Sequence, residues 1–337
     1  MSASPSAPKA PGPSRAVAIP VDAWLDVMGR EYLGDFIPQS GAAVRFAVAE
    51  ATVLDRVADG LRDRAAACGL ECVRLDVAAV RLHMLQSVVF AVAACLPWEQ
   101  LLQARLERLV ADAGHRWPEP GRQVPLPALA EANGVAPHLL RRDLTQALSR
   151  EIWGDSQLTL DFRHAMITLL EARLTGEDAA LCEAVMAWLH GALRSIAQLR
   201  QAQVGRRIDR GNARAVLMSL CRWVRQCSGA HCLDNGGGGG VLLLLDIRQL
   251  HRERRVVTEG LVYTPAAVMD CYEVLRQLID DAEHFPGLFV AVLADDALLS
   301  DDPRRSLGQY TAARTWHSTR ELPRDPRPGR AAGGNGR

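Results

Sequence analysis

Hydrophobic positions follow two different periods along the chain, and the changes between them predict alternating helices and strands. Four large apolar side chains recur at helical spacing near the N-terminus: Trp24, Met28, Tyr32 and Phe36. A helix is therefore expected over 21–37, ended by Pro38. A short strand at 42–48, a helix over 53–68 and an alternating strand at 72–77 follow. This order of strand, helix and strand favours a parallel sheet.

The pattern then stays helical over a long stretch before strands return. Helices are expected at 84–95, 99–113, 126–133, 137–151, 158–174, 178–203 and 212–226. Two continuous apolar runs, at 241–247 and 288–295, are typical of strands buried on both faces of a parallel sheet. A helix over 265–283 lies between them, begun by Thr264 as N-cap and Pro265 in its first turn. The sequence therefore predicts an α/β fold whose sheet is interrupted by a helical insertion.

The charge balance and the lysine content exclude several kinds of functional site. The 337 residues carry 39 basic and 39 acidic side chains, and Lys9 is the only lysine. Zero net charge argues against a generally adhesive nucleic-acid binder, although it permits a local basic patch. Lys9 lies in the Pro/Ser/Ala-rich segment 1–18, which we expect to be disordered, like 317–337. A body without lysine excludes Schiff-base enzymes and sites that need a P-loop lysine. Codon bias of a GC-rich genome is an alternative cause of the arginine excess.

The sequence contains no predicted membrane or export segment. No apolar run approaches the roughly 18 residues of a membrane span, and the N-terminus lacks the apolar stretch of a signal peptide. The eight cysteines are scattered, so we expect reduced thiols and a cytoplasmic location. Cys221, Cys227, His231 and Cys232 lie close together, but their spacing is not a standard zinc pattern, and buried free thiols are the alternative.

The strand at 241–245, which ends in Asp246, has the form of a Walker B segment. In P-loop ATPases this aspartate helps to hold Mg²⁺ beside the phosphates, so Asp246 is the candidate metal and nucleotide ligand. The alternative is an aspartate that caps the next turn. Ile247 stands where an acidic residue would polarise water. The segment after 42–48, AEATVLDRVADGL, has no lysine or phosphate-binding glycine, and it brings Glu50 and Asp55 instead. ATP and Mg²⁺ are therefore possible but doubtful cofactors, and ordinary ATP turnover is not expected.

Four long segments and a shorter one resemble the BREX-type ATP-binding family of bacterial phage-defence clusters. They are WLDVMGREYLGDFIPQSGAAVRFAV at 24–48, GRRIDRGNARAVLMSLCRWVR at 205–225, VLLLLDIRQL at 241–250, YTPAAVMDCYEVLRQLIDDAEHFPGLFVAVLAD at 263–295, and LGQYTAAR at 307–314. The resemblance implies a P-loop NTPase-like core and a role in a multi-protein system against foreign DNA. Of the family's functional residues, only Asp246 carries over.

With this resemblance, we expect a P-loop-like core at 19–78 and 229–316 and an all-helical insertion at 79–228. Within the insertion, Ala130, Gly134 and Leu140 have helix-turn-helix spacing, which would make 137–146 a recognition helix. Arg141 and Arg142 are then the candidate DNA contacts. A simple helical hairpin with a glycine turn fits the same pattern.

One segment of the chain is strongly basic although the net charge of the whole chain is zero. Eight arginines and a single acid, Asp209, lie between residues 194 and 225. Four of them cluster at an expected helix start and are candidate phosphate or nucleotide ligands, because arginine binds phosphate in a bidentate manner: Arg206, Arg207, Arg210 and Arg214. Solvated faces and ion pairs between elements are the alternative.

Together these features predict a degenerate ATPase-like subunit of an antiphage defence system, acting as a scaffold or sensor through protein partners and possibly DNA. The alternative is a helix-turn-helix DNA-binding regulator or adaptor without nucleotide chemistry. No membrane partner is expected.

Overall fold

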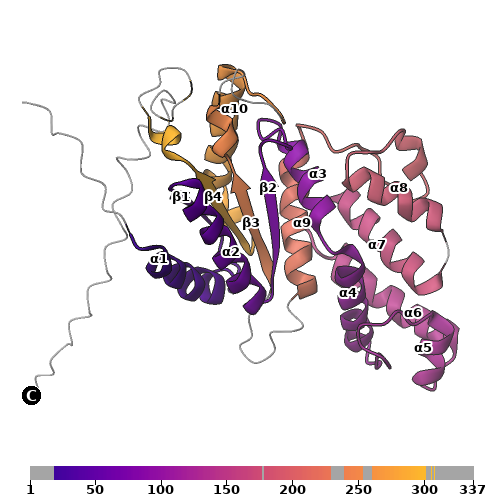
Figure 1. Ribbon diagram of the computed structural model, residues 1–337. Coiled ribbons are helices and arrows are strands. Elements are labelled where there is room, and N and C mark those ends of the chain that lie inside the picture. The colour runs from indigo at the N-terminus through magenta and orange to yellow at the C-terminus, as the bar shows by residue number, and fades with distance from the viewer. Residues whose placement is uncertain are drawn as a thin grey trace, which may run out of the picture.

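The structure, a computed structural model, describes residues 19–176, 178–228, 239–252, 260–300, 305 and 307. Its centre is a four-stranded, all-parallel sheet in the order β1-β4-β3-β2 (Figure 1). The strands are β1 Ala43–Val48, β2 Leu70–Asp76, β3 Gly240–Asp246 and β4 Leu288–Ala294. The α/β class and all four expected strands are confirmed.

Helices make up most of the remaining described residues. The α-helices are α1 Val21–Val27, α2 Ala51–Ala67, α3 Leu85–Cys95, α4 Trp98–Asp112, α5 Leu126–Ala132, α6 Pro137–Leu148, α7 Leu160–Thr175, α8 Ala179–Leu189, α9 Ala213–Ser228 and α10 Pro265–Asp280. Helices α1 and α6 continue as π-helical segments at Met28–Phe36 and Ser149–Trp153. Short 3₁₀ helices lie at Ile196–Leu199, Arg248–His251, Ala282–His284 and Asp296–Leu299.

Alternate residues of the central strands face opposite layers of helices, as the period of two in a strand requires. On one face, Leu242, Leu244 and Phe289 pack with α1, α2 and the π-helical segment. On the other, Leu243 and Val290 pack with α3, α9 and α10. Both faces of β3 and β4 are therefore buried, which explains why these strands are continuously apolar.

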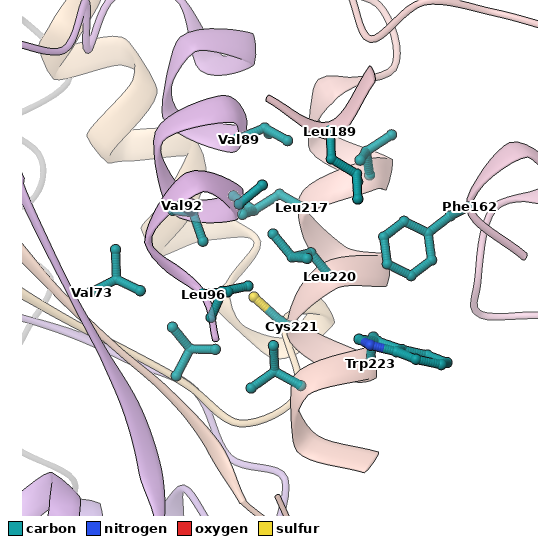
Figure 2. Close-up of a cluster of buried hydrophobic side chains, with 14 of the residues drawn as sticks. Val73, Val89, Val92, Leu96, Phe162, Leu189, Leu217, Leu220, Cys221 and Trp223 are labelled. Carbon is teal, nitrogen blue, oxygen red and sulfur yellow. The ribbon is translucent and has the colours of Figure 1, made fainter. Parts of the chain in front are cut away.

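Helix α9 links the sheet to the rest of the helical region. Figure 2 shows Leu217, Leu220 and Cys221 of α9 between α3 on one side and Phe162 of α7 on the other. A single hydrophobic cluster runs from the sheet through α9 into α4–α8, which lie beyond α9 in Figure 1. The helical region thus packs continuously with the sheet, while its boundaries as a separate domain stay a prediction.

One expected helix is wrong. The segment 178–203 does not form one helix, because α8 ends at Leu189 and a turn follows. Gly191 adopts φ +73°, and the Phe90 ring lies 2.5 Å from where a Cβ would stand. A left-handed glycine packed against a ring terminates a helix that apolar periodicity alone would extend.

Among the described residues, no single helix is long and apolar enough to cross a membrane; α3 and α4 pass on length and composition only as a pair bent by 74°. The expected disordered tails, 1–18 and 317–337, lie outside the described residues.

Candidate functional site

The carboxyl ends of all four strands meet at one edge of the sheet, where open α/β sheets bind their ligands. Asp246 ends β3 and is in register with Asp76 of β2 and Leu293 of β4. Helix α2 begins close to the end of β1, and Arg248 follows the end of β3. This edge is therefore the position at which the sequence predicts nucleotide chemistry.

Asp246 is buried, with only 3% of its surface exposed, and arginines surround its carboxylate. Oδ1 accepts hydrogen bonds from Arg248 Nε at 2.9 Å and from the Arg248 amide at 3.3 Å. Oδ2 accepts from Arg248 Nη2 and from Arg74 Nη2, the latter at 3.3 Å. A carboxylate has about four lone-pair positions, so these four bonds use its whole accepting capacity.

The same two arginines reach Asp55 near the start of α2. Arg248 Nη2 lies 3.2 Å from Asp55 Oδ1, and Arg74 Nη2 lies 3.4 Å from the same atom. Arg248 Nη1 also donates to the carbonyl of Ala51 at 3.5 Å. Two carboxylates and two guanidinium groups thus balance one another. We call Asp55, Arg74, Asp246 and Arg248 the edge cluster.

The pKa values of Asp246 and Arg248 follow from this geometry. Burial alone would raise the pKa of Asp246, but the hydrogen bonds and charge of Arg248, helped by Arg74, outweigh it and lower the pKa. The hydrogen bond to Asp246 correspondingly raises the pKa of Arg248. Both groups are therefore charged at neutral pH.

The connection from β1 to α2 is too short to wrap a phosphate. Strand β1 ends at Val48 and α2 begins at Ala51, so only Ala49 and Glu50 lie between them. The Ala49 amide already donates to Ala294 of β4 at 3.1 Å, and Glu50 is an extended N-cap without a side-chain hydrogen bond. A P-loop instead needs a longer, glycine-rich turn that points several amides at the phosphate.

The residues at this edge do not fit a Mg²⁺–nucleotide complex. Asp246 would have to release both arginines to coordinate a metal ion, and Asp55 and Glu50 would place negative charge near the phosphates. Ile247, where a catalytic acid would stand, is fully buried, and its amide is bonded to Leu293. The donor set at this edge therefore does not suit the Mg²⁺–nucleotide cofactor that the sequence resemblance implies.

Three of the four arginines that the sequence suggests as phosphate ligands make contacts with their own chain away from Asp246. Within the part of the chain that the structure describes, the charged partners of Asp246 are Arg74 and Arg248 alone. Arg206 lies 3.8 Å from Asp209, Arg207 donates to the carbonyl of Arg194, and Arg214 pairs with Asp281 at 2.6 Å. Arg210 is exposed on the same loop.

The start of α9 already holds an anion of its own chain. Asp209 Oδ1 accepts from the amides of Gly211 at 2.8 Å and Asn212 at 3.2 Å, and Asn212 Oδ1 accepts from the Asp209 amide at 2.8 Å. This reciprocal capping places a carboxylate where the sequence suggests a phosphate. Two further arginines of the basic segment are structural, because Arg222 pairs with Asp155 and Arg225 donates to Pro38.

The other candidate residues fall into separate places. Arg141 and Arg142 lie on the exposed side of α6, far along the chain from the edge cluster. Cys221 and Cys227 are buried in α9, while His231 and Cys232 lie outside the described residues. No group of three or more potential metal ligands occurs among the residues that the structure describes.

An open hollow beside the start of β1 does not include Asp246. It is lined in part by Tyr32, Phe36 and Arg45. Arg45 lies over the Tyr32 ring at 4.6 Å and donates to the carbonyl of Val44 at 3.0 Å, which covers part of the strand edge. The hollow is thus separate from the site that the sequence predicts.

Comparison with known proteins finds no matching protein-family model, no similar curated protein and no similar solved structure.

Proposed function

We propose that the chain is an ATPase-like subunit that has lost nucleotide chemistry and serves as a scaffold or sensor, through protein partners, in a bacterial defence system against phage. The edge cluster supports the loss of nucleotide chemistry. The role in phage defence is supported by the resemblance to BREX-type ATP-binding proteins of the segments at 24–48, 205–225, 241–250 and 263–295. The P-loop-like core and the helical insertion belong to this proposal.

At this edge, arginine side chains take the place of the charges that a nucleotide complex would bring. In a working ATPase, a metal ion and a lysine neutralise the phosphates beside the Walker B aspartate. Here, Arg248 and Arg74 neutralise Asp246 directly, and no lysine occurs after Lys9. The guanidinium of Arg248 spans from β3 to the first turn of α2 and so holds the space in which phosphates would lie. The fold is retained at this edge without a place for its ligand.

A nucleotide titration tests the proposal. The purified full chain is titrated with ATP, with and without Mg²⁺, by calorimetry, and phosphate release is measured in parallel. We expect no saturable binding at millimolar ATP and no phosphate release above that of Asp246→Asn, the matched control that keeps the shape of the side chain. ATP turnover that disappears in Asp246→Asn would refute the loss of chemistry.

The partner role needs its own measurement. The tagged full chain is expressed in a host that carries the neighbouring genes, and the proteins that copurify with it are identified. We expect products of adjacent defence genes to copurify in stoichiometric amounts. Purification of the chain alone under these conditions would count against a scaffold.

A further inference from the structure

Helices α5 and α6 form a helix-turn-helix unit. Helix α5 ends at Ala132, Gly134 adopts φ +64° in the turn, and the Val135 amide bonds to Ala130 at 3.1 Å. Helix α6 then starts at Pro137, a residue favoured in the first turn of a helix. The inner side of this hairpin is closed by buried apolar side chains: Leu129, Ala130, Leu140, Leu144 and Ala147. The expected hairpin is confirmed, and its outer side is left to solvent.

The exposed face of α6 is made of hydrogen-bond donors, cations and two apolar side chains, those of Pro137 and Leu139. Its exposed residues are Pro137, His138, Leu139, Arg141, Arg142, Thr145, Gln146, and, where the helix continues, Ser149 and Arg150. The only acid within α6, Asp143, is held by His115 at 3.2 Å and Arg142 at 3.2 Å. Arg150 is paired with Glu151 at 3.1 Å. Three exposed arginines against Asp143 and Glu151 leave this face with a small net positive charge in a chain of zero net charge.

A loop beside the turn adds another cation. The Asn133 side chain accepts from the Arg116 amide at 2.7 Å and donates to the Arg116 carbonyl at 2.9 Å. These two bonds fix the loop next to the α5–α6 turn and leave the Arg116 side chain exposed. In helix-turn-helix proteins, the elements around the recognition helix bind the DNA backbone while that helix lies in the groove.

We propose that the exposed face of α6 binds double-stranded DNA, with α6 in the major groove. The groove admits one α-helix, and in this placement Arg141 and Arg142 bind the backbone phosphates, while Gln146 can read adenine and an apolar side chain can contact the thymine methyl group. Leu139, 38% exposed, is the apolar contact. Arg141 is exposed at the rim of a small hollow between α6 and α7, so its guanidinium group can reach a DNA backbone. This binding site is independent of the edge cluster and requires no nucleotide.

The second basic region of the chain supplies a matched control. Arg206 and Arg207 are exposed, like Arg141 and Arg142, but they lie on an irregular loop that Asp209 organises. A pair of Arg→Gln changes removes the same charge in either place. The two double variants are therefore expected to differ in DNA affinity only if α6 has a specific role in binding.

The test is fluorescence anisotropy of the full chain with a labelled random-sequence duplex a few helical turns long, at salt concentrations between about 50 and 200 mM. The wild type, R141Q/R142Q and R206Q/R207Q are compared after circular dichroism has shown that all three are folded. Each lost phosphate contact lowers the salt slope by about one. We expect R141Q/R142Q to bind about tenfold more weakly at the lower salt concentration with a slope reduced by about two, and R206Q/R207Q to match the wild type.

Three outcomes would overturn the assignment. The first is no binding of duplex by the wild type at the lowest salt concentration. The second is an equal loss in both double variants, which would show a diffuse charge effect. The third is tighter binding of single-stranded DNA or RNA than of duplex. A failed nucleotide titration leaves this result unaffected, so the two proposals stand or fall separately.

Discussion

Replacing Arg248 with alanine leaves a buried carboxylate with half of its partners. Asp246, 3% exposed, would lose both bonds from the Arg248 side chain and keep those from the backbone amide at position 248 and from Arg74, each at 3.3 Å. Hydrogen bonds to charged groups contribute about 1.5–3 kcal/mol each, and removing one partner of a buried ion pair costs about 3–5 kcal/mol. Because Arg74 remains and the site lies at the edge of the sheet, we expect a loss of about 2–3 kcal/mol in the free energy of unfolding at neutral pH.

The pH dependence of that loss has a definite sign. In the wild type, the pKa of Asp246 is lowered on folding, so its contribution to stability is present above the unfolded pKa of about 3.9 and is lost as pH falls through the folded pKa. Without Arg248, burial becomes the larger effect and raises the pKa of this carboxyl. The charged form then destabilises the variant at neutral pH, and protonation relieves it. The difference between wild type and variant should therefore shrink as pH falls.

Urea unfolding followed by circular dichroism at several pH values between about 7.5 and 4.5 measures this difference. Asp246→Asn removes the charge that Arg248 compensates, so R248A should cost much less in that background than in the wild type. The reasoning is refuted if R248A unfolds within about 0.5 kcal/mol of the wild type at neutral pH, or if its loss is the same across the pH range.

Two further predictions concern the helical region. Burial raises the pKa of both Cys221 and Cys227 to about 12, so mass spectrometry after native thiol labelling near pH 8 should find Cys95 modified and these two cysteines modified only after unfolding. Gly191→Ala should lower the free energy of unfolding by about 1–3 kcal/mol, because it forces a side chain into positive φ and against Phe90; thermal or urea unfolding measures the loss, and wild-type stability would contradict it.

The layout of strands and helices was largely predictable because hydrophobic burial dominates it. Strands β3 and β4 are buried on both faces and therefore read as continuous apolar runs, and α10 carries an N-cap threonine that bonds the Ala267 amide. The break after α8 was not predictable in the same way. Its cause is the turn at Gly191, which packs against Phe90 of α3, a residue distant in the sequence that periodicity within one segment cannot detect.

The edge cluster was predictable only in part. Asp246 was found from its strand, and Asp55 was expected to bring negative charge to this edge. Arg74 was missed, because an arginine on an alternating strand looks like a solvent-facing residue, and only the register of β2 with β3 brings it to Asp246. For the basic segment, closeness in the sequence predicted a shared phosphate site that the contacts of its arginines do not form. Its arginines are neighbours in sequence, but Arg214 and Arg222 pair with acids on different elements, Asp281 and Asp155.

An internal guanidinium and a bound cofactor neutralise the same edge with different consequences. A bound nucleotide stabilises a fold in proportion to the logarithm of its free concentration, so a working ATPase couples its stability and shape to ligand supply. Arg248 is part of the chain, and its bonds to Asp246 and Asp55 close this edge at any nucleotide concentration. Under the proposed function, any change of state in the subunit must therefore come from a partner that contacts another surface. The exposed face of α6 is such a surface, and α4 and α9 connect it to the sheet through one continuous core.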